Sequence, residues 1–292
     1  MKNRNILILI LFLLTFTLYF FNNIFSDILL IAFLILGLDL SSDAIFDQIG
    51  KNSVPGFNYG FLVLGFVTSL DEIFVAVGSI LSGAPDIGSG ALLGSSFFMI
   101  VIYSILMLVF GYKLNIKHPY YFIVFPFFLI VDSISFSLSV NLIPLYFISI
   151  IVSLLILYLV LEGWGNHVWK INRSQLKTSI FLIPLLMFAL LLSIATDRFS
   201  GAVRIDQFLS GFLILGILGT VPETVVVYSS LKNRMPDASE GLLTGSTLIK
   251  GTLLFPIFEI FFYTSREFNF GSVLISAVVS LVFSFYIFSY KD

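Results

Sequence analysis

Two glutamates, Glu72 and Glu223, stand inside long apolar segments, where a carboxylate is costly unless it is paired, hydrated or bound to a cation. Residues that supply oxygen ligands or break a helix precede them: Thr68, Ser69 and Asp71 before the first, and Gly219, Thr220 and Pro222 before the second. Carboxylates, carbonyls and hydroxyls form hard-oxygen sites, which suit Ca²⁺ or Na⁺ rather than softer metals. The two glutamates are therefore candidate cation ligands. The alternative is a buried hydrogen-bonded pair that only holds helices together.

The two glutamates occupy equivalent places in an internal repeat. Residues 60–96 and 211–247 align without a gap at a constant offset of 151, and 14 of the 37 aligned positions are identical. The repeat also pairs Ser95 with Ser246, which are candidates either for helix packing or for lining the site. Repeated apolar segments that are interrupted by glycine and carry carboxylates are typical of the binding sites of secondary transporters.

The residues around each glutamate also predict the local backbone. Pro222 lacks an N–H and so frees the carbonyl of Leu218, beside Gly219. Irregular backbone is tolerated at membrane depth only where it lines a cavity or a site, so we expect unwound backbone beside Glu223. The repeated glycines at a spacing of four instead favour close helix packing; they are Gly90 and Gly94, and Gly241 and Gly245.

The composition indicates an integral membrane protein. The chain of 292 residues is 58% hydrophobic and only 11% charged, against about 25% charged residues in a soluble domain. It has no cysteine, which excludes disulfides and thiolate metal sites. No basic tail suggests nucleic-acid binding, and no nucleophile–base pair, nucleotide loop or cofactor motif indicates an enzyme.

Ten segments are apolar enough to cross a bilayer, which takes about 20 residues. They are 5–22, 28–47, 57–83, 87–110, 119–139, 141–162, 179–197, 206–231, 237–263 and 270–289. With the N-terminus in the cytoplasm, eleven Lys and Arg residues of the loops and ends lie inside and three lie outside, as the positive-inside rule requires. The same topology places the C-terminus in the cytoplasm.

In this topology segment 57–83 runs outward, whereas its copy 206–231 runs inward. A two-fold axis in the membrane plane would then bring Glu72 and Glu223 together near the midplane. We expect an all-α polytopic membrane protein with about ten transmembrane helices and an inverted-topology repeat. Its parts are an additional helix at 1–27, a first half at 28–163 with its repeat at about 60–99, a cytoplasmic linker at 164–178, and a second half at 179–292 with its repeat at about 211–250.

The order of the motifs adds a resemblance to a known family. Residues 68–72, 83–87 and 90–96 of the first copy, and 222–223, 236–237 and 241–247 of the second, follow roughly the order G-T-S-x-P-E, G-x-x-D-I and G-N-x-x-G-S-N. This order resembles the α-repeats of the cation/calcium exchanger superfamily, which includes the sodium/calcium exchangers. The resemblance implies that Glu72 and Glu223 coordinate Ca²⁺ and Na⁺, with further ligands at Thr68, Ser69, Ser95, Gly219, Thr220 and Ser246.

Three residues depart from the family pattern and would modify the site. Asp71 replaces the first proline, and Met99 and Lys250 stand where the family has an Asn or Asp, 27 residues after each glutamate. Lys250 lies about 20 Å along segment 237–263, too deep to snorkel. We expect its ammonium to neighbour Glu223, Glu72 or Asp71 and to act as a built-in counter-cation. The alternative is a charge pair that only holds helices together in a divergent, inactive member of the family.

The resemblance implies a secondary active antiporter that exchanges Ca²⁺, or a related cation, against Na⁺ or H⁺ by alternating access. The alternatives are a divergent relative with altered ion or proton coupling, and a membrane protein that does not transport. Inorganic cations and the lipid bilayer are the expected partners, with no cofactor besides the transported ions. The compact loops and the resemblance favour a prokaryotic plasma membrane.

Overall fold

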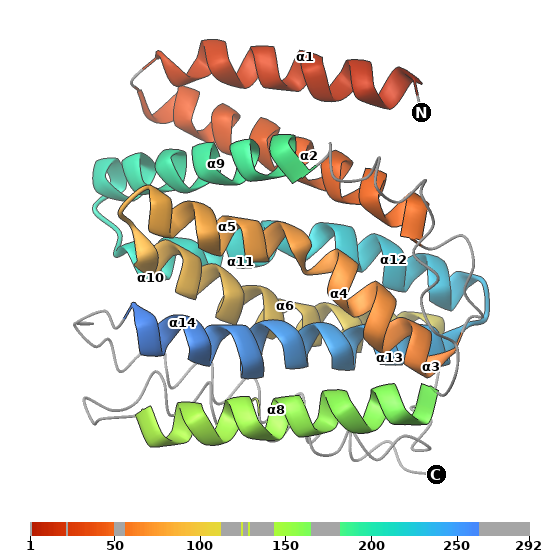
Figure 1. Cartoon of the computed structure of the whole chain (residues 1–292). Coiled ribbons are helices and arrows are strands. Elements are labelled where there is room, and N and C mark those ends of the chain that lie inside the picture. The colour runs from red at the N-terminus through yellow and green to blue at the C-terminus, as the bar shows by residue number, and fades with distance from the viewer. Residues whose placement is uncertain are drawn as a thin grey trace. The chain divides into compact units, whose positions relative to one another are not determined.

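The computed structural model describes residues 2–21, 23–49, 56–111, 143–164 and 182–262, together with Val124 and Phe128. All regular structure in these residues is helical (Figure 1). The elements are α1 Lys2–Tyr19, α2 Ile24–Ile49, α3 Phe57–Tyr59, η2 Gly60–Leu64, α4 Gly65–Thr68, α5 Leu70–Leu81, α6 Pro85–Phe110, α8 Ile143–Trp164, α9 Leu182–Val203, α10 Gln207–Ser210, η4 Gly211–Leu215, α11 Gly216–Gly219, α12 Val221–Lys232, α13 Pro236–Thr247, η5 Leu248–Leu254 and α14 Phe255–Phe261. The elements named η are π-helical.

Six helical stretches in the described part of the chain are long and apolar enough to cross a membrane. They are Phe57–Leu81, Pro85–Phe110, Ile143–Gly163, Leu186–Val203, Gln207–Lys232 and Pro236–Phe261. The expected spans 5–22 and 28–47 coincide with α1 and α2, whose apolar parts are shorter. The expected span 270–289, nearly all of 119–139 and the linker beyond Trp164 lie outside the described residues, so the count of ten helices stays a prediction.

Contacts divide the chain into two compact units. The first unit contains Met1–Ser53, Val67–Ser95 and Trp169–Pro222, and the second contains Val54–Phe66, Ser96–Val168 and Glu223–Asp292. The units interleave along the sequence, so each of them contains segments from both repeats.

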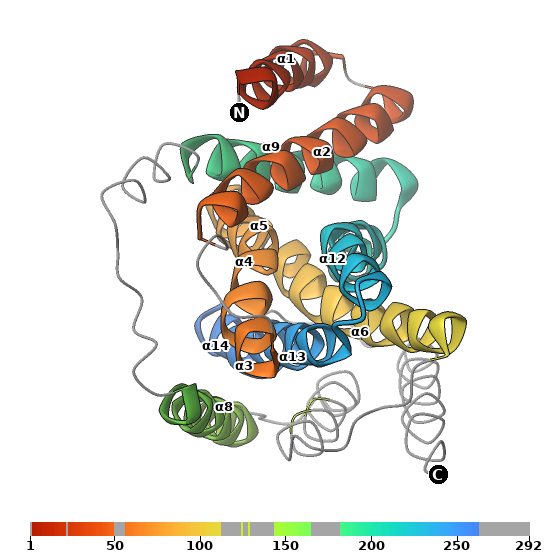
Figure 2. The ribbon, with the colours of Figure 1, turned by 90° about the vertical axis from the view of Figure 1, so that its right-hand side faces the viewer.

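In the first unit, α9 packs along both α2 and α5, and α1 packs on α2 (Figures 1 and 2). Ser193 of α9 donates a hydrogen bond to the carbonyl of Val75 in α5, at 3.2 Å. The two helices approach closely because Gly78 has no side chain, and a Cβ there would lie 2.9 Å from the backbone of Ala189. Helix α5, which carries Glu72, is therefore held directly against α9.

A buried ion pair joins the N-terminal helices to α9 in the same unit. The guanidinium of Arg198 donates to the carboxylate of Asp27, which is almost fully buried in α2. It also donates to the carbonyl of Tyr19 at 3.1 Å and lies over the Tyr19 ring. One arginine side chain thus connects α1, α2 and α9.

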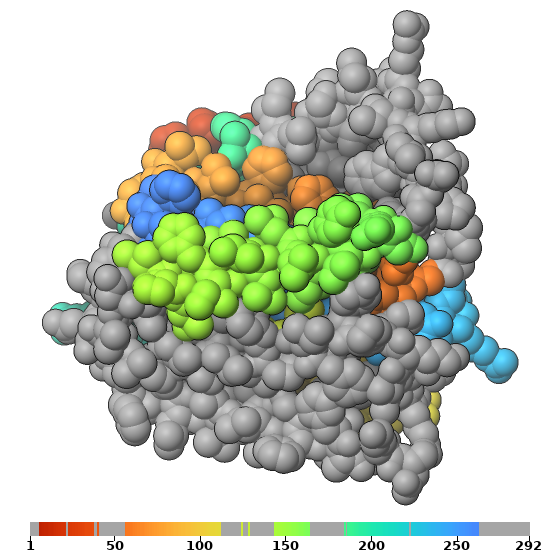
Figure 3. All heavy atoms as spheres, turned by 60° about the horizontal axis from the view of Figure 1, so that its bottom comes forward, coloured from red at the N-terminus to blue at the C-terminus, as the bar shows by residue number. Residues whose placement is uncertain are grey.

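In the second unit, α8 packs on η5 and α14 and turns its other face outward (Figure 3). The outward side chains are large and apolar and run the length of the helix; they include Phe147, Ile151, Leu155 and Tyr158. Such a mostly apolar face is typical of a helix that contacts lipid.

The helix boundaries of the two repeats coincide at the offset of 151. The π-helical segments Gly60–Leu64 and Gly211–Leu215 occupy equivalent positions, and each is followed by one turn of α-helix. A single turn residue, Ser69 in one copy and Thr220 in the other, then precedes the helix that carries the glutamate. Each repeat therefore interrupts its helix at the same point, just before the acidic residue.

The repeated glycines make equivalent close contacts, each set within one unit. A Cβ on Gly241 would lie 2.1 Å from the carbonyl oxygen of Phe57, and a Cβ on Gly90 would lie 2.2 Å from that of Phe208. Gly245 against Phe61 and Gly94 against Phe212 repeat this arrangement at 2.2 and 2.3 Å. Only glycine permits helices this close, which agrees with the packing role predicted from the sequence.

Candidate functional site

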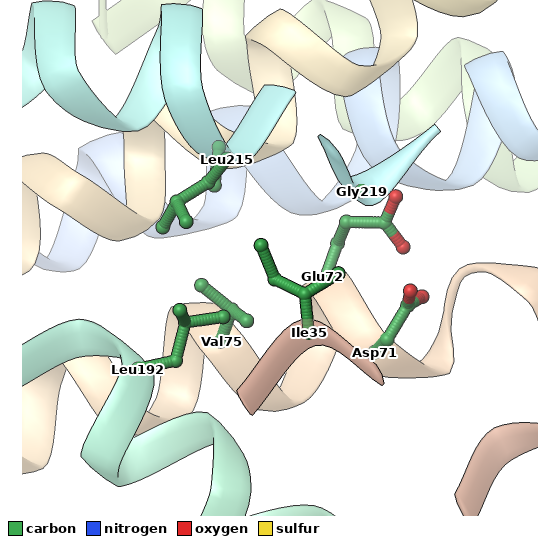
Figure 4. A pocket seen from close by; sticks show the side chains of 8 residues that line it. Ile35, Asp71, Glu72, Val75, Leu192, Leu215 and Gly219 are labelled. Carbon is green, nitrogen blue, oxygen red and sulfur yellow. The ribbon is translucent and has the colours of Figure 1, made fainter. Parts of the chain in front are cut away.

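Asp71 and Glu72 line a small cavity in the first unit, which is named here the first half-site. Gly219 lies on its wall, and the remaining lining is apolar: Ile35, Val75, Ala91, Leu192 and Leu215 (Figure 4). The cavity volume is about 20 Å³, slightly more than the roughly 10–15 Å³ that one water needs. A single cation of similar size, such as Ca²⁺ or Na⁺, would fit this volume.

The position of the two carboxylates follows from the helix break at Ser69. Asp71 and Glu72 fall in the first turn of α5, and both are buried. A helix N-terminus carries partial positive charge, which stabilises carboxylates there by about 0.3–1 kcal/mol. Acidic side chains buried in an apolar membrane segment are typical of ion pathways, so the half-site is suited to a cation.

Gly219 brings backbone against the Glu72 carboxylate. A Cβ at this position would lie 3.2 Å from Glu72 Oε1, which is tighter than an ordinary contact, and 3.5 Å from its Cγ. Figure 4 shows the Glu72 side chain extending toward Gly219. The absence of a side chain at 219 thus leaves space for the carboxylate.

The other residues predicted for this half-site are buried but make local contacts. Ser95 donates to the carbonyl of Leu92 at 3.3 Å, and the Thr220 hydroxyl donates to the carbonyl of Ile217 at 2.7 Å. Thr68 and Ser69 are buried just before the acidic pair. None of these four is part of the cavity lining described above.

The backbone before Glu223 is less irregular than the sequence suggested. The carbonyl of Leu218, which Pro222 frees, accepts a hydrogen bond from the Thr220 N–H, and helix α12 already begins at Val221. Thr220 has φ −79° and ψ −5°, close to helical values. The predicted unwinding is therefore limited to one turn residue, because Thr220 satisfies the freed carbonyls itself.

Glu223, Ser246 and Lys250 meet in the second unit, and they are named here the second half-site. Lys250 Nζ lies 2.9 Å from both Glu223 Oε1 and Oε2, and both side chains are 0% exposed. The Ser246 hydroxyl donates to Oε1 of the same carboxylate. Removing one partner of such a buried pair costs about 3–5 kcal/mol, so Glu223 and Lys250 depend on each other.

The π-helical segment η5 positions Lys250. Ser149 of α8 donates to the carbonyl of Thr252 at 2.6 Å, and Ser153 donates to its hydroxyl at 2.8 Å. Gly251, next to Lys250, faces the ring of Phe128, which a Cβ would approach to 2.3 Å. Sequence reasoning did not include these supporting residues, although the glycine directly after Lys250 hinted at a close contact.

The first repeat has no such segment at the equivalent place. Residues 97–103 are ordinary α-helix within α6, and Met99 is buried there among the core side chains. Two of the three predicted site-modifying residues, Asp71 and Lys250, therefore lie in the half-sites, whereas Met99 lies in the apolar core.

Among the described residues, no three His, Cys, Asp or Glu side chains cluster as a metal site. A cation at either half-site would thus need carbonyl, hydroxyl or water oxygens as well, which Ca²⁺ and Na⁺ accept readily. Glu72 and Glu223 belong to different units, and their convergence stays a prediction.

Comparison with known proteins shows a partial family match and a similar fold. Residues 176–292 match the family model described as sodium/calcium exchanger protein. The fold resembles the Ca²⁺/H⁺ antiporter protein YfkE, with a TM-score of 0.66 and 16% sequence identity, over 99% of this chain and 91% of that chain. It resembles the H⁺/Ca²⁺ exchanger CAX with a TM-score of 0.58 and 16% identity, over 96% of this chain and 81% of that chain. It also resembles the sodium-calcium exchanger NCX_Mj, with a TM-score of 0.50 and 19% identity, over 96% of this chain and 90% of that chain. No curated protein matches the sequence. The resemblance of the repeats to the cation/calcium exchanger superfamily is thereby confirmed.

Proposed function

Because the chain is an integral membrane protein related to the sodium/calcium exchangers, we propose that it is a secondary active cation antiporter. It exchanges Ca²⁺, or a related cation, against Na⁺ or H⁺ by alternating access. The observation that carries this proposal is the pair of buried carboxylates at repeat-equivalent positions, Glu72 and Glu223, each directly after a helix break. Buried acids in membrane segments are expensive and indicate ion pathways.

The binding site takes residues from both repeats. Glu72 and Asp71 supply carboxylates beside a cavity of suitable size, and Glu223 supplies the equivalent carboxylate of the second copy. Thr68, Ser69, Ser95, Gly219, Thr220 and Ser246 are further oxygen ligands, through hydroxyl or carbonyl groups. Gly219 of the second repeat lies against the Glu72 carboxylate of the first, so residues of both repeats adjoin this carboxylate.

The repeats have inverted topology and belong to a fold of about ten transmembrane helices. Two observations support the structural equivalence of the repeats: the matching helix boundaries at an offset of 151, and the equivalent glycine contacts within each unit. The Lys/Arg bias places both termini in the cytoplasm, and the compact loops fit a prokaryotic plasma membrane. The chain performs transport rather than catalysis.

Exchange follows from competition for one site. Ca²⁺ and the counter-ion need the same carboxylates, so only one type of load is bound at a time. A site with buried uncompensated charge is costly to move through the hydrocarbon region, whereas a neutralised site is not. Reorientation therefore takes place only when the site is loaded, and this couples the two ion fluxes.

Calcium uptake into proteoliposomes tests the proposal, together with calorimetric titration of the purified protein with Ca²⁺, Na⁺ and Mn²⁺. Glu72→Gln and Glu223→Gln should each abolish binding and uptake, because each removes a ligand charge from the site. Glu162→Gln, on the exposed face of α8, is the control and should behave like the unmodified protein. A protein that binds none of these ions would instead be a membrane protein without transport activity.

A further inference from the structure

We propose that Asp237 and Glu240, near the start of α13, form an entry site that binds a divalent cation such as Ca²⁺ from one side of the membrane and passes it toward the second half-site. This inference rests on the antiport function proposed above and deepens it. The entry site lies outside both half-sites. It raises the rate at which the cation arrives and leaves the affinity of the transport site unchanged.

Glu240 is a buried acid that belongs to neither half-site. It lies in the apolar stretch Pro236–Phe261 and is only 3% exposed. In the described part of the chain its carboxylate takes part in no hydrogen bond or ion pair, and the Thr244 hydroxyl donates to its backbone carbonyl instead. A carboxylate at such a place is costly unless a cation or water accompanies it, and acids of this kind mark ion pathways. Glu240 is therefore a group to which a cation is drawn.

Further oxygen atoms lie around the Glu240 carboxylate. The hydroxyl of Tyr103 in α6 is close to the carboxylates of Glu240 and Asp237, and the Ser239 hydroxyl lies beside it. Tyr103 is 1% exposed, and its hydroxyl forms no hydrogen bond of normal geometry within the described residues. Carboxylates and hydroxyls are hard-oxygen ligands, which Ca²⁺ accepts together with water. So few protein ligands bind weakly, which suits a site on a pathway, because the cation has to leave it again.

Helix α13 leads from this site toward the second half-site. Asp237 is half-buried in the first turn, at the end of the apolar stretch. Glu240, Thr244 and Thr247 follow at spacings of three and four residues, which places them on one face of the helix. Thr247 lies about 15 Å further along the axis than Asp237. It is fully buried, and its hydroxyl has no hydrogen-bond partner in the described part of the chain. The next residue back, Ser246, already belongs to the second half-site.

The entry site exists in one repeat only. Ser89 stands in the first repeat where the second has Glu240, and its hydroxyl donates to the carbonyl of Asp86, the counterpart of Asp237, at 3.2 Å. A concentration of negative charge raises the association rate of a cation by a factor of about 10–1,000. With the inverted repeats proposed above, the two helix starts face opposite sides of the membrane. The effect is therefore confined to one side.

Two positive side chains precede the entry site. Lys232 and Arg234 lie in and after the last turn of α12, and both are exposed. Lys232 also lies over the ring of Tyr228. Salt screens exposed charges much more than a buried one such as Glu240. The two cations therefore weaken the attraction without removing it.

Initial rates of Ca²⁺ uptake from each face of the membrane test the inference, with inside-out and right-side-out vesicles presenting the two faces. At Ca²⁺ concentrations far below KM, Glu240→Gln should lower the rate about tenfold, and only from the side on which α13 begins. The loss should shrink between about 0.01 M and 1 M salt, because the Debye length falls from about 30 to 3 Å. The Kd for Ca²⁺ in calorimetric titration should not change, since an entry site speeds arrival and departure equally.

Two further variants keep the test decisive if Glu240→Gln does not fold. Glu240→Ser copies the first repeat and Asp237→Asn alters a half-buried position, and each should show the same one-sided loss. Glu162→Gln removes the same charge from an exposed position and is the matched control. Unchanged rates, an equal loss from both faces or a changed Kd would overturn the inference and leave the antiport function intact. An unmodified protein that neither binds nor carries Ca²⁺ would overturn the antiport function, and the inference with it.

Discussion

At the scale of single residues, each half-site contains a buried glutamate, but the neighbours of the two glutamates differ. Glu72 is accompanied by a second acid and a cavity, whereas Glu223 is accompanied by a base. In both cases the carboxylate is buried, where an unpaired charge is not tolerated. One half-site is thus suited to an exchangeable cation, and the other is neutralised by the chain itself.

Gly219 gives a prediction at this scale. Replacing it with alanine places a methyl group 3.2 Å from Glu72 Oε1, so the carboxylate must shift away from its present position. Affinity for Ca²⁺ should fall by about tenfold, a change of 1.4 kcal/mol that calorimetric titration resolves. Gly201→Ala is the matched control, because nothing lies within 4 Å of a Cβ there. Equal affinity in the two variants would show that the Glu72 carboxylate does not bind the ion in this position.

The sequence predicted that Lys250 has an acidic neighbour, but not which one. Burial of Lys250 in an apolar segment required an acidic neighbour, but the spacing allowed Glu223, Glu72 or Asp71 equally. The choice of Glu223 depends on the helical register in η5, where an i→i+5 segment rotates the side chains that follow. Nothing in the pattern of apolar residues separates that register from an ordinary α-helix.

At the scale of elements, the long apolar runs predicted the helices well. The run 57–83 corresponds to helical residues 57–81, and the run 87–110 corresponds to α6. The sequence predicted unwound backbone beside Glu223, whereas the structure has a single turn residue there, Thr220. The difference arises because one hydroxyl residue can satisfy the carbonyls that a helix break frees.

The equivalent glycine contacts give a prediction for these elements. Gly90→Ala and Gly241→Ala each force a Cβ to within 2.2 Å of a backbone carbonyl, so the paired helices must separate. Each change should destabilise the protein by about 1–3 kcal/mol, as overpacking does. Gly163→Ala, with nothing within 4 Å of its Cβ, should be neutral or stabilising by up to about 1 kcal/mol.

Thermal unfolding of the three glycine variants in detergent measures this difference. The first two should lose stability by similar amounts, because they occupy equivalent positions in the two repeats. If either variant unfolds at the same temperature as Gly163→Ala, the close contact at that glycine is not formed in the membrane protein.

At the scale of the whole molecule, the inverted topology can be tested at the turns that follow the two glutamate helices. Ser82 and Asn233 are equivalent residues in these turns, and each is followed by a residue with positive φ, Gly83 at 79° and Arg234 at 58°. Inverted repeats place the two turns on opposite sides of the membrane, whereas parallel repeats place them on the same side.

Labelling of single cysteines decides between these topologies, because the chain has no cysteine of its own. Ser82→Cys should react with an impermeant maleimide added outside intact cells. Asn233→Cys should react only after the cells are opened. The unmodified chain is the control for background labelling. Reaction of both cysteines from the same side would rule out the inverted arrangement.

The matched π-helical segments at Gly60–Leu64 and Gly211–Leu215 also bear on the ancestry of the chain. An i→i+5 turn holds one residue more than the α-helical turn it replaces, so it records an insertion into a regular helix. Both copies carry that extra residue at the same register. The insertion is therefore older than the gene duplication, and the single-copy ancestor already had it. The π-helical segment at Lys250 has no counterpart in the first copy, so the two copies have since changed differently at this place.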